Sequence, residues 1–189
     1  MAYPAVFTRA ALVLVFGLAV VGKLRSRRHY LSFVESLRPF VPARFVSARP
    51  ASAIVSARPA SAVLSASAAS MLTAEFACAV LLALPATSRL SHWLAAVLLA
   101  VVTGAAGWAV AARRPAACQC FGGTARPLGR VHVIRNSLLL TLAVIGGLVD
   151  DGPMHAGGVV LAVAAGAVGA LLLIRMDDLL ALGGARQVA

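Results

Sequence analysis

The sequence predicts an all-α protein, a polytopic membrane helix bundle with four to five transmembrane helices and one short amphipathic helix at the membrane interface. Hydrophobic residues make up 61% of the 189 residues and charged residues only 12%, whereas soluble domains average roughly 45–50% and about 25%. The apolar residues also fall into five long runs separated by polar segments, as in a chain that crosses a bilayer repeatedly. We therefore expect a single membrane domain over residues 1–189, in a multi-pass protein of the cell (plasma) membrane.

The formal charge of +11 would also suit a nucleic-acid-binding protein, but the chain shows no basic stripe on a soluble domain and no nucleic-acid-binding motif. Most basic residues lie in segments 23–65 and 113–132, between apolar runs. The positive-inside rule places these segments and the C-terminus in the cytoplasm. The expected partner is thus the lipid bilayer and not nucleic acid.

The first apolar run, Ala5–Gly22, is followed directly by Lys23 and three arginines, without an A-x-A cleavage pattern. This predicts an uncleaved first helix and not a signal peptide. The other spanning helices are expected at Ala66–Leu84, Leu90–Ala112, Val131–Val149 and His155–Ile174. Small residues four apart in two of them predict close helix contacts; these pairs are Ala100/Gly104, Ala162/Gly166 and Ala165/Gly169.

Between the first two spanning helices, apolar residues recur with the period of an amphipathic helix; they are Tyr30, Phe33, Val34 and Leu37. We interpret this stretch as a helix on the membrane surface that ends at Pro39, with a basic solvated loop as the alternative. The sequence VSARPASA then occurs twice, at Val46–Ala53 and Val55–Ala62. A short unit that occurs twice is not a solenoid, so residues 46–63 are interpreted as a duplicated loop insert.

Two unusual residues lie in the second predicted spanning helix. Glu75 is near its middle, and Cys78, three residues later, shares its face. An ionisable side chain at that depth costs about 2.5–3.5 kcal/mol on insertion scales, so Glu75 should be protonated or have a basic partner inside the bundle. Lys23, Arg9 and Arg135 are the candidates. Glu75 then either fixes helix packing alone or takes part in function.

The only cluster of thiols lies between the third and fourth runs, in Cys118-Gln119-Cys120-Phe121-Gly122-Gly123. A C-x-C disulfide is strained, and strained, exposed disulfides are the labile or catalytic ones. Chemistry alone leaves three interpretations: a redox dithiol with Cys78 as a third partner, two ligands of a soft metal such as Cu(I) or Zn(II) with His132 added, or inert residues in a loop. The cytoplasm keeps thiols reduced, which conflicts with a role in oxidising exported proteins.

These features resemble the methylamine-utilisation MauE family, within the wider DoxX-like group of small membrane proteins. The resemblance covers about residues 5–150 and leaves 157–174 as an extra C-terminal transmembrane helix. The VSARPASA duplication and Cys78 depart from the family pattern. The motifs that carry the resemblance are Gly22-Lys23-Leu24, Phe33-Val34-Glu35-Ser36-Leu37 followed by Val41-Pro42, Leu72-Thr73-Ala74-Glu75, Cys118-Gln119-Cys120-Phe121-Gly122 and Arg135-Asn136.

The resemblance implies a protein that supports maturation of the disulfide-rich small subunit of methylamine dehydrogenase, together with a thioredoxin-like partner protein. Cys118 and Cys120 would then be the catalytic redox pair of a thiol-disulfide oxidoreductase or an accessory maturation factor. Glu75 would be a buried structural or proton-handling carboxylate, and Arg135 its partner.

The sequence contains no recognisable cofactor or metal site, and a quinone enters only by analogy with membrane thiol oxidoreductases. The alternative function is a small membrane transporter or soft-metal-handling protein that uses Cys118 and Cys120 as ligands. A structural helper of a larger complex, without chemistry of its own, is a third.

Overall fold

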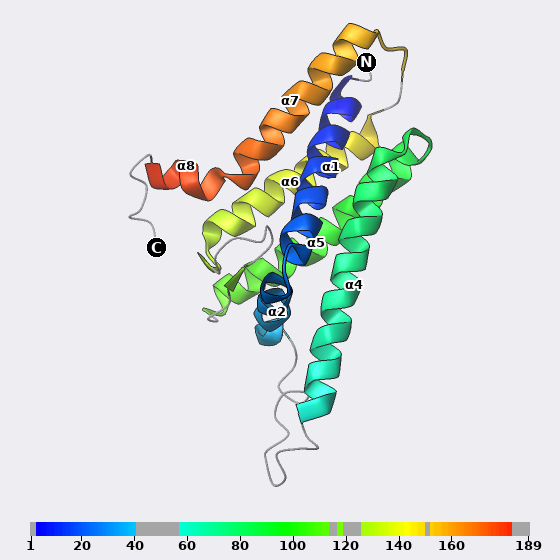
Figure 1. The fold of residues 1–189 in the computed structure, drawn as a ribbon. Helices are drawn as coiled ribbons and strands as arrows, with labels where there is room; N and C mark the ends of the chain where they lie inside the picture. The colour runs from blue at the N-terminus through cyan, green and yellow to red at the C-terminus, as the bar shows by residue number, and fades with distance from the viewer. Residues whose placement is uncertain (1–2, 41–56, 114–116, 119–125, 150–151, 183–189) are drawn as a thin grey trace.

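The computed structural model describes residues 3–40, 57–113, 117–118, 126–149 and 152–182. Within them, five helices are long and apolar enough to cross a membrane, which confirms the predicted all-α membrane fold. The chain alternates in direction, so that the start of α1 and the end of α7 lie at opposite ends of the bundle (Figure 1). The five helices are α1 (Tyr3–Leu24), α4 (Ala57–Ala83), α5 (Ser88–Ala111), α6 (Arg130–Leu148) and α7 (Ala156–Ile174).

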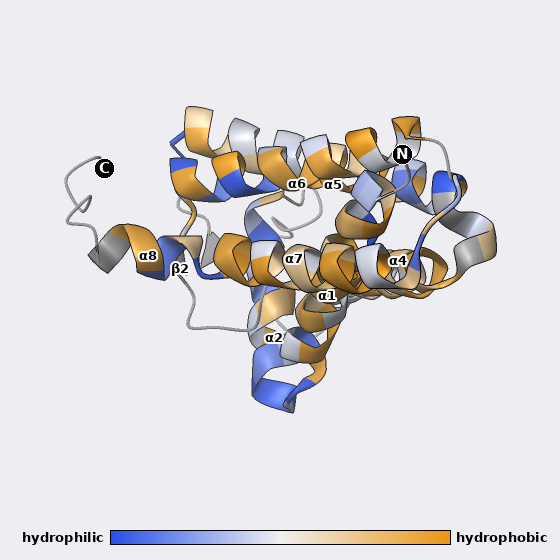
Figure 2. Cartoon of the chain, turned by 90° about the horizontal axis from the view of Figure 1, so that it is seen from above, coloured by the Kyte–Doolittle hydropathy of each residue, from blue (hydrophilic) through white to orange (hydrophobic). Residues whose placement is uncertain are grey.

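The spanning helices form two layers, with α7, α1 and α4 in one and α6 and α5 in the other (Figure 2). The central helix is α1, which packs against α7, α4 and α6. Its residues Leu12 and Phe16 are therefore buried in the core, while residues such as Leu161 on α7 and Val101 on α5 are exposed. Apolar side chains on the outside suit a surface that meets lipid tails, which are as apolar as leucine.

Small residues allow α7 to approach α1 closely, as the sequence predicts. A Cβ atom on Gly166 would lie 2.5 Å from the backbone oxygen of Phe7, so only glycine fits there without a shift. The Ala162/Gly166 pair is buried at this contact. In contrast, the predicted contact at Ala100/Gly104 is not made within the described chain, since a Cβ atom on Gly104 would meet nothing within 4 Å.

The expected amphipathic helix is present as α2 (Arg27–Ser36), followed by the 3-10 turn η1 (Arg38–Phe40). The Ser26 side chain caps it by accepting a hydrogen bond from the His29 backbone amide at 3.3 Å, as serine commonly does at a helix start. Phe33, from the apolar face, is buried. The apolar face therefore packs at least partly on protein, and Pro39 lies in the turn just after the helix.

The start of α4 corrects the sequence interpretation of the duplicated loop. The helix begins at Ala57 and not near Ala66, so most of the second VSARPASA copy is helical. Pro59 lies in the first turn, where a backbone N–H has no partner within the helix and proline is tolerated. The first copy lies outside the described residues.

Four shorter elements complete the described chain: η2 (Pro85–Thr87), the two-residue strands β1 (Ala117–Cys118) and β2 (Arg126–Pro127), and α8 (Met176–Leu182). Helix α8 was not predicted from the sequence. Its first turn contains Asp177 and Asp178, and negative charge there interacts favourably with the helix dipole.

Candidate functional site

The predicted redox motif lies in the connection between α5 and α6. Strand β1 pairs with β2 in antiparallel fashion, with Cys118 opposite Arg126 and Ala117 opposite Pro127. Strand β1 also contacts α2. The pairing therefore brings Cys118 and Arg126 together beside the amphipathic helix. Cys120 and the rest of the hexapeptide lie outside the described residues.

Defined local structures flank this connection on both sides. After α5, Arg113 adopts a left-handed conformation with φ 49°, and its backbone N–H donates to the Val110 carbonyl at 3.1 Å. This conformation costs a non-glycine residue on the order of 1 kcal/mol. Before α6, the Gly129 backbone N–H donates to Nδ1 of His132 at 3.4 Å. The chain thus leaves one spanning helix by a fixed turn and enters the next at a capped first turn.

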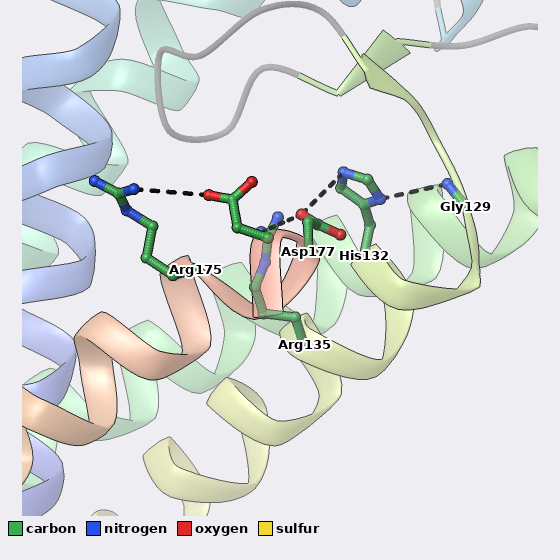
Figure 3. Close-up of polar contacts among 6 residues, drawn as sticks. Gly129, His132, Arg135, Arg175 and Asp177 are labelled. Atoms are coloured by element: carbon green, nitrogen blue, oxygen red, sulfur yellow. Dashed lines mark hydrogen bonds and ion pairs between the residues drawn. The ribbon is translucent and has the colours of Figure 1, made fainter. Parts of the chain in front are cut away.

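The beginning of α6 is tied to α8 by a buried polar cluster (Figure 3). Arg135 Nη1 donates to Oδ2 of Asp177 at 3.2 Å. His132 Nε2 lies 4.0 Å from the same oxygen. His132 and Arg135 are both buried, so Asp177 supplies a negative charge where water has little access. Nδ1 of His132 is thereby occupied by the Gly129 backbone, and the use of His132 as an extra metal ligand stays a prediction.

These contacts overturn the interpretation of Arg135 as the partner of Glu75. The partner is Lys23, the second-last residue of α1, whose Nζ contacts both carboxylate oxygens of Glu75. The Lys23 side chain is 0% exposed and that of Glu75 8%. A buried pair of opposite charges is much cheaper than either charge alone, so each residue accounts for the other's presence at this depth.

The third basic candidate, Arg9, has a different role. Its Nε donates to the Leu82 carbonyl at 2.5 Å and its Nη2 to the Ala83 carbonyl at 2.9 Å. These are carbonyls of the last turn of α4, which have no partner within the helix. Arg9 and Lys23 therefore attach α1 to α4 at two different levels.

The Lys23–Glu75 pair also fixes α2 to the bundle. The ring of Phe33 lies over Lys23, with Nζ 4.6 Å from the ring centroid, which is cation–π geometry. Three helices, α1, α2 and α4, thus meet at one buried cation. Because α2 also contacts β1, this charged cluster lies one element away from the strand that carries Cys118.

Cys78 is a free, buried thiol on α4. It belongs to the hydrophobic core cluster that includes Leu82, Ala95 and Leu99. This environment is typical of a cysteine that serves as a small apolar side chain. The position favours a packing role for Cys78 over that of a third redox partner.

A second buried polar cluster was not predicted. Thr8 Oγ1 donates to the Ala5 carbonyl at 3.1 Å and lies 3.2 Å from Nε2 of His92. Both side chains are completely buried between α1 and α5, and a Cβ atom on Gly146 of α6 would overlap the His92 ring. A histidine inside an apolar run is the signal that would have found this cluster, because such residues face the bundle interior.

The arrangement can be compared with known proteins at this point. A family model described as methylamine utilisation protein MauE matches residues 1–149. The match extends from α1 through α6 and includes Lys23, Glu75, Cys118 and Cys120, while α7 and α8 lie beyond it. No curated protein and no solved structure matches the chain. Because the match covers most of the chain, this membrane protein belongs to the MauE family.

Proposed function

We propose that this protein supports thiol-disulfide exchange on a partner protein, with Cys118 and Cys120 as the redox pair. The carrying observation is the placement of Cys118 in β1, where it pairs with Arg126 of β2. Cys118 lies outside the five candidate spans, in the connection between α5 and α6. Cys78, by contrast, is buried in α4.

The proposed exchange has two steps. A thiolate of the client attacks one sulfur of the Cys118–Cys120 disulfide, which forms a mixed disulfide and releases the other motif sulfur as a thiolate. A second client thiolate attacks the mixed disulfide, so that the client becomes oxidised and the motif becomes a dithiol. Two electrons and two protons pass from client to motif. A thioredoxin-like partner in its disulfide form would re-oxidise the motif by the same exchange.

The family description, methylamine utilisation, supports a client in methylamine metabolism. By the resemblance noted above, we propose the disulfide-rich small subunit of methylamine dehydrogenase. The five spanning helices and the basic connections between them support a location in the cell membrane, with the motif on the cytoplasmic face by the positive-inside rule. A client in an oxidising compartment would need the opposite face.

Thiol trapping of the purified protein in defined redox buffers tests the redox pair. We expect a reversible disulfide that is lost in Cys118→Ser and in Cys120→Ser and is unchanged in Cys78→Ala, the matched control for the third thiol. Two permanently free motif thiols would sink the proposal. Stoichiometric Cu(I) or Zn(II) held by the motif, without a reversible disulfide, would instead favour metal handling.

The face of the membrane needs a separate measurement. Intact cells are treated with a membrane-impermeant thiol reagent in the Cys78→Ala background, so that only the motif cysteines react. Labelling before lysis would overturn the charge-based orientation and favour oxidation of exported clients. Labelling only after lysis would support the cytoplasmic placement.

A further inference from the structure

Three arginines at the junction of α1 and α2 carry positive charge that the described chain does not compensate. Arg25, Arg27 and Arg28 are all exposed, and none of them takes part in an ion pair within the described residues. By contrast, Lys23 binds Glu75, and Arg38 lies 2.8 Å from Glu35. The junction is thus a local excess of three positive charges.

The junction lies at the level where a spanning helix leaves the membrane. The candidate span of α1 ends at Leu24, and Arg25 is the next residue. Leu24 and Leu31 are 55% and 53% exposed, so exposed apolar side chains lie close in sequence to the exposed arginines. The surface combines guanidinium groups with apolar side chains at the edge of the bilayer.

The orientation of this surface is fixed by the buried side of α2. Phe33 lies over Lys23 in the cluster described above, which directs the opposite side of the helix, with Arg27, Arg28 and Leu31, away from the bundle. The strongly hydrophilic end of α2 projects beyond the two layers of spanning helices (Figure 2). Arg27 and Arg28 are therefore presented outward on a helix that the protein core holds in place, and Arg25 lies just before that helix.

An external anion is the missing counterpart of this charge. Two of the arginines lie in the first turn of α2, which contains no acidic residue, and positive charge at that end of a helix opposes the helix dipole. Guanidinium groups bind phosphate oxygens in a bidentate manner. A free phosphate would satisfy the charge but would leave Leu24 and Leu31 in water, whereas a phospholipid satisfies both features.

We propose that Arg25, Arg27 and Arg28 bind the headgroup phosphates of anionic phospholipids while Leu24 and Leu31 contact the acyl chains of the same lipids. A basic residue near an anionic lipid surface raises affinity about fivefold. Three such residues predict a preference for anionic over zwitterionic lipid of roughly a hundredfold. This surface does not depend on the redox role proposed for the cysteines.

Lipid titration followed by native mass spectrometry of the purified, full-length protein tests this site. Phosphatidylglycerol and phosphatidylcholine are added separately to the detergent-solubilised protein, and the apparent affinity for the first bound lipid is compared. The wild type is expected to prefer phosphatidylglycerol. The triple variant Arg25→Gln/Arg27→Gln/Arg28→Gln is expected to lose most of that preference.

Two variants make the result specific. Arg38→Gln removes an exposed arginine of the same segment that already has Glu35 as a partner, and it is expected to keep the wild-type preference. The triple Arg→Lys variant keeps the charge and is expected to restore most of it, which distinguishes lost binding from lost folding. The substitutions remove positive charges that influence how the protein is oriented in the cell membrane. Because lipid affinity is measured on the purified protein, a change of orientation does not affect the result.

The proposal is overturned if the triple Gln variant binds phosphatidylglycerol as the wild type does, or if Arg38→Gln loses the preference equally. Competition identifies the source of the phosphate. Inorganic phosphate or a short DNA duplex that displaces the lipid at comparable concentration would reject a lipid site in favour of a general anion site. Failure of both to compete is the expected result.

Discussion

In the buried Lys23–Glu75 pair, we expect removal of one partner to destabilise the protein more than removal of the other. Removing one member of a buried ion pair typically costs about 3–5 kcal/mol, because the other charge stays buried without compensation. Lys23 is the second-last residue of α1, so after Glu75→Leu its long side chain can turn to the membrane surface. Glu75 lies about 12 Å along α4 from Ala83, the end of that helix, and has no such route.

We therefore expect Lys23→Met to destabilise the protein by about 3–5 kcal/mol. Glu75→Leu should cost less, about 2 kcal/mol, the value of a lost hydrogen bond between charged groups. The double variant Lys23→Met/Glu75→Leu replaces the pair by apolar side chains of similar size, which is often neutral or stabilising. The double variant should thus be more stable than Lys23→Met alone, by about 3 kcal/mol or more.

Equilibrium unfolding of the purified protein by SDS in mixed micelles measures these differences. The matched control is the exposed pair of Arg38 in η1 and Glu35 in α2, whose side chains are 57% and 61% exposed. An exposed pair is worth about 0.2–1 kcal/mol, so its double-mutant cycle should show little coupling. The reasoning fails if Lys23→Met costs less than Glu75→Leu, or if the double variant is no more stable than Lys23→Met.

Two further predictions concern helix contacts. Gly146→Ala should destabilise the protein by about 1–3 kcal/mol, because the new methyl group would overlap the His92 ring. Gly104→Ala, where the methyl group would meet open space, should be neutral or stabilising by up to about 1 kcal/mol; thermal unfolding checks both, and equal effects would contradict the packing described. Asp177→Asn should weaken the attachment of α8 to α6 and increase proteolysis at the C-terminus. Asp178→Asn, whose pair with an exposed arginine lies on the surface, should leave proteolysis unchanged, and a similar increase in both would refute the anchoring role.

The spanning helices could be predicted from the sequence because a long apolar run has few other stable structures in a bilayer. Predicted and observed bounds of α5, α6 and α7 differ by at most two residues. The predicted start of α4 near Ala66 was wrong, because Pro59 was interpreted as part of a loop. Proline is, however, acceptable in the first turn of a helix. Local sequence does not distinguish these two uses of proline.

Pairing between distant residues was harder to predict than helix position. The need of Glu75 for a basic partner follows from its depth, but Lys23, Arg9 and Arg135 all met that requirement. The choice depends on how far each helix extends relative to α4, which is set by packing of the whole bundle. The engagement of Arg135 by Asp177 could not be foreseen because α8 itself was not predicted.

For the proposed redox motif, the sequence predicts which residues matter but not how they are arranged. Its two cysteines and their position between spanning helices are visible in the sequence, and so is the resemblance to the MauE family. The pairing of Cys118 with Arg126 across β1 and β2 is not visible in the sequence, because strands of two residues carry almost no periodic signal. The contact of β1 with α2 likewise arises only from the folded arrangement.

The separation of Lys23 and Glu75 along the chain has a consequence for biosynthesis. The two residues are 52 positions apart, so α1 enters the membrane well before α4 has been synthesised. During that interval Lys23 has no carboxylate partner, and its position near the end of α1 lets the ammonium group remain among the lipid headgroups. It can turn inward only when Glu75 arrives. The charged pair can therefore form only after α4 has entered the membrane beside α1.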